Sequence, residues 1–194
     1  NSGIGSNGLT SARHELLSKY YLENYPETFD PSTDRDYVYC GPYRLNDKLT
    51  GSGLTIGEAL LSPTRTYLPL IKDISTDLGT HLRGAVHCSG GGQTKCLRFG
   101  SQVKFIKDNL FSAPPLFQEI QKVSGTTEEE MYQVYNMGHR LEIYCEPGHE
   151  DNVLAIAKNY SIDAKVIGIT AASETHDQKN HLEIINGKKV LKYQ

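Results

Sequence analysis

Two glycine-rich segments contain residue types and spacings that suit the binding of an anion. The first, Ser2-Gly3-Ile4-Gly5-Ser6-Asn7-Gly8, directly precedes a run of helical periodicity. Unpaired N–H groups at a helix start, together with the helix dipole, attract a phosphate or carboxylate, and glycine lets the backbone approach it. We therefore predict an anion site formed by Gly3, Ser6, Asn7 and Gly8. Because a GxG before a helix is a weak motif, a tight turn capped by Ser6 or Asn7, without a ligand, is the alternative.

The second segment, His87-Cys88-Ser89-Gly90-Gly91-Gly92-Gln93-Thr94, follows a predicted apolar strand. Ligands commonly bind beyond the carboxyl ends of strands, and three consecutive glycines lose much conformational entropy on folding. We predict that Gly90, Gly91 and Gly92 present bare backbone to a ligand. His87 is the candidate catalytic group, since its side chain donates or accepts a proton near neutral pH. The alternative is a structural histidine, hydrogen-bonded at the end of the sheet.

Two arginines lie where they can neutralise a bound oxyanion. Arg13 lies one turn beyond the first glycine segment, and Arg65 lies in Ser62-Pro63-Thr64-Arg65-Thr66-Tyr67. A guanidinium suits phosphate recognition, although a surface ion pair is the alternative for each arginine. We predict that the two glycine segments converge on one anion site beside Arg13 or Arg65. The competing picture is two unrelated turns on separate faces.

Other common catalytic motifs are missing. Neither a Walker-type GxxxxGK[ST] nor a GxSxG nucleophile elbow occurs. The four cysteines, Cys40, Cys88, Cys96 and Cys145, form no CxxC pair, so we interpret them as reduced thiols of a cytoplasmic protein. His87, Cys88 and Cys96 match no common zinc spacing, and no metal site is predicted.

The elements that must position these segments alternate between helices and strands. Residues 8–24 have helical spacing, and 25–53 form a long excursion with a short strand at 37–39. A helix is expected over 63–78, kinked at Pro69. The segment 83–94 is expected to be an apolar strand that ends in the three glycines, and further strands are expected at 102–107, 139–146 and 164–170. Helices are expected at 114–123, 127–134 and 150–160, and a hairpin at 182–193 turning at Asn186-Gly187. This order predicts an α/β or α+β layered domain with helices on a mixed sheet.

Within these elements, apolar phase predicts seven buried residues: Leu9, Leu16, Ile71, Val86, Ile143, Ile156 and Val166. In the 139–146 strand, Leu141, Ile143 and Cys145 are expected to face the core, and Arg140, Glu142 and Tyr144 the other side.

Composition narrows the function classes. The 194 residues include 20 Lys+Arg and 23 Asp+Glu, a net charge of −3 that disfavours a nucleic-acid binder. No stretch approaches the roughly 18 apolar residues of a membrane helix, and no secretory signal is recognisable. Residue 1 is Asn and the methionines are Met131 and Met137, so we expect a trimmed domain or a fragment of a longer protein. Residues 171–194 are expected to form a polar linker and the terminal hairpin.

Four blocks resemble the C-terminal half of aminoimidazole ribonucleotide (AIR) synthetases, the phosphoribosylformylglycinamidine cyclo-ligases. They are Ser2–Thr10 with Arg13, Gly57-Glu58-Ala59-Leu60-Leu61-Ser62-Pro63-Thr64-Arg65-Thr66-Tyr67, His87–Gly92, and Tyr135-Asn136-Met137-Gly138. Their order and approximate separation match that family from residue 2 to about 170. The resemblance makes residues 1–194 a single C-terminal domain.

The resemblance implies an ATP-dependent ring closure of formylglycinamidine ribonucleotide in purine synthesis. It further implies a magnesium-bound nucleotide, held mostly by an N-terminal half, a ribonucleotide substrate, and a homodimer in the full-length protein. The isolated domain is then expected to fold but not to catalyse, and neither nucleic acid nor membrane is an expected partner.

This chain also departs from the family pattern. The family usually has His where Gly5 stands, Leu-Thr-Glu-Asn where Gln93-Thr94-Lys95-Cys96 stand, and a small and an apolar residue where His139-Arg140 stand. A proton-transfer role of that usual His cannot be carried over. Three alternatives therefore stay open: a divergent cyclo-ligase, a paralogue that uses ATP on another substrate, and a non-catalytic anion-binding or regulatory module.

Overall fold

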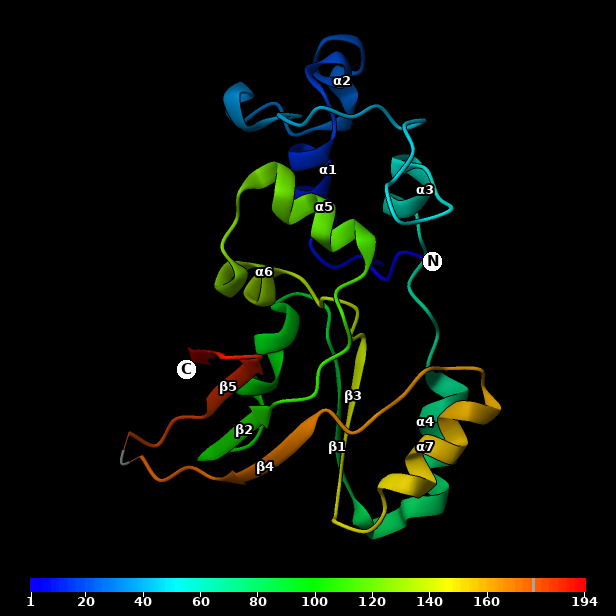
Figure 1. Cartoon of the computed structure of the whole chain (residues 1–194), viewed down its shortest axis with the longest axis vertical. Coiled ribbons are helices and arrows are strands. Elements are labelled where there is room, and N and C mark those ends of the chain that lie inside the picture. Colours follow the sequence, from blue (N-terminus) through cyan, green and yellow to red (C-terminus); the bar gives the residue numbers. More distant parts are fainter. Residues whose placement is uncertain (176) are drawn as a thin grey trace. The chain divides into compact units, whose positions relative to one another are not determined.

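The computed structural model describes residues 1–175 and 177–194, which form two compact units (Figure 1). The first unit comprises Asn1–Thr64, Ser89–Gln93 and Ser112–His139, and the second comprises Arg65–Cys88, Thr94–Phe111 and Arg140–Gln194. The first glycine segment and Ser89–Gln93 of the second belong to the first unit, whereas His87, Cys88, Thr94 and Arg65 belong to the second. His176, within the predicted polar linker, lies outside the described residues.

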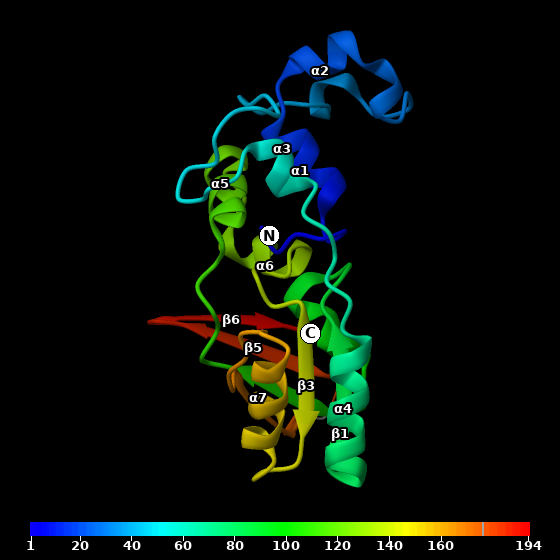
Figure 2. The same ribbon diagram turned by 90° about the vertical axis from the view of Figure 1, so that its right-hand side faces the viewer.

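The first unit is helical. Its elements are α1 (Leu9–Leu16), α2 (Lys19–Asn24), η1 (Pro26–Thr28), η2 (Arg35–Tyr37), α3 (Ile56–Leu60), α5 (Pro115–Ser124) and α6 (Glu128–Val134). Helix α1 contacts α3 and α5, and the three lie side by side in Figure 2. Fully buried side chains of these helices include Leu16, Ile56, Phe117 and Ile120. The helices predicted at 114–123 and 127–134 are confirmed, the second with Thr127 capping the N–H of Glu130.

The single helix predicted over 8–24 is wrong, because the chain breaks at Leu17 and Ser18. Both residues have extended backbone. The N–H of Ser18 donates to the carbonyl of Tyr43 at 2.9 Å, and the carbonyl of Leu17 accepts from the N–H of Gly41 at 2.9 Å. These backbone bonds to the returning chain replace helical bonds, so tertiary pairing overrides the local periodicity.

The excursion over 25–53 also differs from the expectation. Residues 35–37 form η2 in place of the predicted strand at 37–39, because Asp34 caps the turn by accepting from the N–H of Asp36. Helix α3 was not predicted, although Thr55 and Glu58 form a capping box at its start. The following helix, α4 (Leu68–Leu78), begins five residues later than expected. Pro69 therefore lies in its first turn, where a missing N–H costs nothing, and causes no kink.

The second unit contains two sheets. Strand β1 (Leu82–His87) pairs antiparallel with β3 (Leu141–Cys145). The other sheet has the order β4-β2-β5-β6, with β2 parallel to β5 and the remaining pairs antiparallel; its strands are β2 (Val103–Lys107), β4 (Gly168–Ala172), β5 (His181–Asn186) and β6 (Lys189–Tyr193). Two short segments complete the unit's order, η3 (Gly79–His81) and η4 (Gly92–Arg98), whose first two residues belong to the first unit.

Helices α4 and α7 (Glu150–Asn159) enclose an apolar cluster with the β1–β3 ribbon (Figure 1). The buried centre of this cluster includes Leu70, Ile74 and Leu78 of α4. Leu141, Ile143 and Cys145 of β3 pack against it, which confirms the predicted alternation on this face of the strand. Helices thus pack on mixed sheets, which confirms the α+β architecture. None of the helices in the described ranges is long and apolar enough to cross a membrane.

The opposite face of β3 is also covered, which the alternation did not predict. Glu142 is 5% exposed and accepts a hydrogen bond from Lys107 Nζ of β2 at 2.5 Å. The Tyr144 hydroxyl donates to the other carboxylate oxygen of Glu142. A charged residue on the expected solvent face is therefore buried, with partners that compensate for its desolvation.

Other expectations are confirmed in part. Strand β4 begins four residues later than predicted, and Val166 is 45% exposed, so its predicted burial is wrong. Leu16 and Val86 are buried, and the other four predicted core residues are half-buried. The terminal hairpin is present, but Asn186 pairs with Lys189, which moves the two-residue loop one position later, to Gly187-Lys188.

Candidate functional site

The two glycine segments are neighbours in the first unit, and Asn7 joins them. Its Nδ2 donates to the carbonyl of Ser89 at 2.7 Å and to that of Val134 at 3.0 Å. Its Oδ1 accepts from the N–H of Asn136 at 2.5 Å. Asn7 is 3% exposed and every hydrogen-bonding position of its amide is used except one lone pair. The two loops are therefore neighbours and not turns on separate faces, and their convergence on one anion site stays a prediction.

Two further sequence blocks meet the first glycine segment. Ser2 donates from Oγ to the carbonyl of Ala59 at 2.6 Å, and its N–H donates to Ser62 Oγ at 2.9 Å. Asn136 Nδ2 donates to the carbonyl of Gly3 at 3.1 Å. Segments near residues 2–8, 59–64, 89–92 and 134–138 thus form one loop cluster, although they are far apart along the chain.

Packing explains several of the glycines. Gly8 has φ +65°, and a Cβ there would lie 2.5 Å from the Tyr135 ring. Gly92 has φ +50°, and a Cβ there would lie 2.4 Å from the Tyr135 carbonyl oxygen. Both positions exclude a side chain because of this protein's own backbone conformation and packing. Glycine at these two positions therefore does not by itself indicate a ligand.

Gly90 is different. It is exposed, its backbone conformation is open to other residues, and a Cβ built on it would meet no atom within 4 Å. Neither conformation nor packing requires glycine there. Gly90 thus leaves open space at the outer surface of the loop cluster, next to Gly91, which has φ +97°.

The start of α1 matches the expectation for an anion-binding terminus in part. Gly8 is the capping residue in left-handed conformation, and no side chain caps the helix. The first intrahelical acceptor is the Gly8 carbonyl, bonded by the N–H of Ala12. The predicted cap residues do not serve: Asn7 is committed to the loop contacts above, and Ser6 is exposed. The N–H groups of the first turn of α1 point along the helix axis past Gly8 and have no acceptor within the helix.

Arg13 points to another part of the first unit. Its Nη2 donates to the carbonyl of Thr28 in η1 at 3.1 Å, and its Nε is buried without a hydrogen-bond partner among the described residues. In this structure Arg13 therefore supports the excursion that follows α2, and its role at an anion remains a prediction.

In the second unit, His87 ends β1 within a group of cations. Its ring meets the Tyr67 ring edge-on, with centroids 5.9 Å apart. Partial burial and the positive charges of Lys95 and Arg140 lower the pKa of His87 below its ordinary 6.5. Burial raises the pKa of Tyr67, while Arg140 and Arg65 oppose that rise. The electrostatic surroundings of His87 and Tyr67 are thus positive, which suits a phosphate, and His87 is neutral near pH 7, which suits a proton acceptor.

Sequence reasoning missed four residues of these arrangements. Asn136 and Gln93 tie the loop cluster together, with Gln93 Nε2 donating to the Asn136 carbonyl at 2.7 Å. Lys95 and Arg140 contribute positive charge beside His87. In the sequence, these four residues are marked only by lying in or next to the blocks that resemble the family. Gln93, Lys95 and Arg140 differ there from the usual family residues, and that difference does not predict their contacts with the loop cluster or with His87.

The buried thiols belong to the second unit and have perturbed acidity. Burial raises the pKa of Cys96 to about 11, and burial also raises the pKa of Cys88, whose Sγ donates to Glu142 Oε1 at 3.4 Å. Such thiols are poor nucleophiles and poor metal ligands. Among the described residues, the side chains with metal-ligand spacing are His81, Glu146 and His149, at the opposite end of β1 from His87.

Comparison with known proteins extends these observations. A family model described as AIR synthase related protein, C-terminal domain, matches residues 1–177. A phosphoribosylformylglycinamidine cyclo-ligase of Methanocaldococcus jannaschii is 32% identical over 193 residues, which cover 99% of this chain and 47% of that protein. One from Methanococcus vannielii is 30% identical over 194 residues, covering 98% and 49%. The chain spans about half the length of the curated relatives it matches.

Proposed function

Because the chain belongs to the family of AIR synthase related proteins and corresponds to their C-terminal domain, we propose that it is the C-terminal domain of an ATP-dependent phosphoribosylformylglycinamidine cyclo-ligase. The reaction closes the imidazole ring of formylglycinamidine ribonucleotide to give aminoimidazole ribonucleotide, a step of purine synthesis. The observation that carries the proposal for this chain is the loop cluster, because Asn7 brings two glycine segments together at an open edge beside Gly90.

The chemistry needs an anion site and a proton acceptor. The amide oxygen of the substrate attacks the terminal phosphorus of ATP and releases ADP. A nitrogen of the substrate then attacks the activated carbon and expels phosphate, while the ring nitrogen loses a proton. An N-terminal half would hold most of the Mg²⁺–nucleotide, and the ion would supply positive charge to the phosphates. Within this chain, we assign phosphate contacts to the backbone of residues 3–8 and 90–92, and the proton to the neutral imidazole of His87.

The proposal also includes the partners of the domain. An N-terminal half of the same protein would supply the nucleotide contacts, and the full-length protein would be a homodimer in the cytoplasm. Arg65 and Arg140 would contribute positive charge toward the ribonucleotide phosphate.

The anion site is tested by titrating the chain with inorganic phosphate and following backbone amides by NMR. We expect the amides of residues 3–8 and 90–92 to shift together. Gly90→Val places a side chain in the open space without a packing conflict, and should weaken phosphate binding while leaving the fold intact. Gly84→Val is the matched control, because Gly84 also has open space but lies in β1. Shifts that survive Gly90→Val unchanged would contradict the site.

The activity is tested on the full-length protein. Purified enzyme, ATP, Mg²⁺ and formylglycinamidine ribonucleotide should give ADP and aminoimidazole ribonucleotide, and residues 1–194 alone should give neither. Full-length Gly90→Val should lose most of the turnover, whereas Gly84→Val should not. Phosphate binding without turnover in the full-length protein would favour the non-catalytic module, and ATP hydrolysis with a different acceptor would favour the paralogue. Full turnover by the isolated chain would refute the assignment of nucleotide contacts to a missing half.

A further inference from the structure

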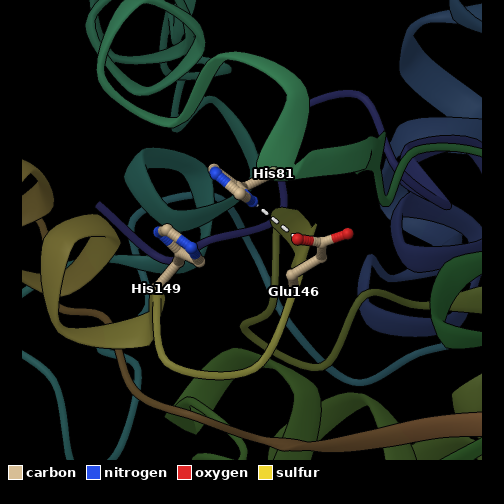
Figure 3. Close-up of side chains that lie close together, drawn as sticks. All are labelled: His81, Glu146 and His149. Carbon is tan, nitrogen blue, oxygen red and sulfur yellow. Dashed lines mark hydrogen bonds and ion pairs between the residues drawn. The ribbon is translucent and has the colours of Figure 1, made fainter.

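Three side chains with metal-binding chemistry meet at one end of the β1–β3 ribbon. His81, Glu146 and His149 each offer a ligand atom, and these atoms all lie within 4.8 Å of one another (Figure 3). His81 Nδ1 lies 2.6 Å from Glu146 Oε2. The rings of His81 and His149 are stacked, with centroids 4.1 Å apart and planes inclined by 17°. All three residues belong to the second unit, whereas the loop cluster that carries the proposed anion site belongs to the first.

The backbone holds the three positions firmly. Leu82 pairs with Cys145 in the β1–β3 ladder, and beyond it the N–H of Glu146 donates to the His81 carbonyl at 3.0 Å. Glu146 and His149 are the first and last residues of a turn closed by an N–H to carbonyl bond of 3.3 Å. Pro147 and Gly148 fill the middle, and the Gly148 φ of +91° is typical of a type II turn. A ladder end and a tight turn thus fix the three α-carbons relative to one another.

We propose that His81, Glu146 and His149 form a binding site for a divalent ion of the zinc class. Two imidazoles and one carboxylate are a ligand set that suits Zn²⁺, whereas Ca²⁺ and Mg²⁺ prefer oxygen ligands alone. Three protein ligands leave a fourth tetrahedral position for water or an external ligand. His81 and Glu146 side chains are 48% and 35% exposed, so an ion can enter from solvent.

The geometry requires only side-chain adjustment. Ligand atoms around a tetrahedral zinc lie about 3.4 Å apart when the bonds are about 2.0–2.1 Å long. The present spacings extend to 4.8 Å, so rotations that move the donor atoms by on the order of 1 Å bring them into range. The guanidinium of Arg83 contacts Glu146 Oε1, which leaves Oε2 for the metal and orients the carboxylate.

The site is separate from His87, the proposed proton acceptor in the same unit. His81 directly precedes β1 and His87 is its last residue. Six residues of extended chain at about 3.3 Å each place the two histidines roughly 20 Å apart. The proposed ion therefore stabilises the turn between β3 and α7 and does not act on the reacting atoms.

The test is a zinc titration of the chain by competition with a chromogenic chelator. It is carried out in a Cys40→Ser background, because an exposed thiol such as Cys40 can compete for zinc. We expect one saturable site. Losing even an outer-shell partner of a metal ligand weakens affinity about 10–100-fold, so His81→Ala and His149→Ala should each weaken it by at least about 100-fold. His181→Ala is the matched control, because His181 also lies beside a carboxylate, that of Asp177, at 3.1 Å.

Cobalt gives an independent readout. Co²⁺ bound at this site should show ligand-field absorption without a thiolate charge-transfer band. The ligand-field absorption should disappear in His149→Ala. Zinc should also raise the melting temperature of the parent chain but not that of His149→Ala. Circular dichroism confirms that each variant is folded. Absence of saturable zinc binding in the parent chain, or binding that survives both His81→Ala and His149→Ala, would overturn the proposal.

Discussion

The buried pair Lys107–Glu142 links the two sheets of the second unit, and its removal is the sharpest test of how that unit is stabilised. Both side chains are 4% exposed, and Nζ lies 2.5 Å from Oε1. Tyr144 donates to the second oxygen of Glu142, and Cys88 Sγ lies 3.4 Å from the first. The carboxylate therefore has one cationic donor and two neutral ones.

We expect Lys107→Met to lower the free energy of unfolding by about 3–5 kcal/mol, since it leaves a buried carboxylate without its cation. Glu142→Gln should cost a similar amount, because it leaves a buried ammonium. The double variant should cost much less than the sum of the two, because a neutral amide beside a methionine has no unpaired charge. The expected coupling is at least about 2 kcal/mol, within the range measured for residues in one buried network.

The assay is urea unfolding at pH 7, followed by circular dichroism, with the midpoint and the slope compared between variants. The control is Lys104–Glu183, an ion pair of 3.1 Å whose side chains are 33% and 22% exposed. Lys104→Met should cost no more than about 1 kcal/mol, since solvent screens this pair. If Lys107→Met costs as little as Lys104→Met, or if the double variant is additive, the pair does not stabilise the unit as argued.

Three further predictions follow from the contacts described above. Asn7→Ala removes the three hydrogen bonds of a buried side chain, worth about 1 kcal/mol each, so urea unfolding should show a loss of about 2–4 kcal/mol. An unchanged midpoint would contradict the role of Asn7 in joining the loops. Leu16→Ala should cost about 2–5 kcal/mol because Leu16 is fully buried, whereas Val166→Ala should stay within about 0.5 kcal/mol, and equal costs would contradict the burial pattern. NMR titration should give a His87 pKa below 6.5, and this pKa should rise in Lys95→Ala. Because the folded state disfavours the charged imidazole, the contribution of His87 to the free energy of unfolding is full above pH 6.5 and declines as the pH falls through 6.5 toward the folded pKa.

Local sequence patterns determined most of the regular elements. Alternating and helical periodicities predicted β1, β2, β3, α5, α6, α7 and the terminal hairpin, since each of these has one apolar face and clear end signals such as Pro115 and Thr127. Glycine and asparagine in the glycine segments predicted turns, because these residues adopt the backbone conformations that turns require. These features depend on interactions within a few residues of sequence.

Tertiary structure decided the rest, because the deciding partners are distant in sequence. The break after α1 depends on Tyr43, and the burial of Glu142 depends on Lys107, 35 positions away. Asn7 seemed suited to a ligand, but the fold directs its amide to Ser89, Val134 and Asn136. A polar side chain binds whichever complementary group the fold brings nearest, and its own identity does not select among them.

The histidine cluster illustrates the same limit. Glu146 and His149 are three residues apart, a spacing too common to indicate a metal, and His81 lies 65 positions from Glu146. Only the register of β1 against β3 brings the three together, because antiparallel pairing places the start of one strand beside the end of the other. The sequence by itself determined that these side chains can bind a metal, and the strand pairing decided that they meet.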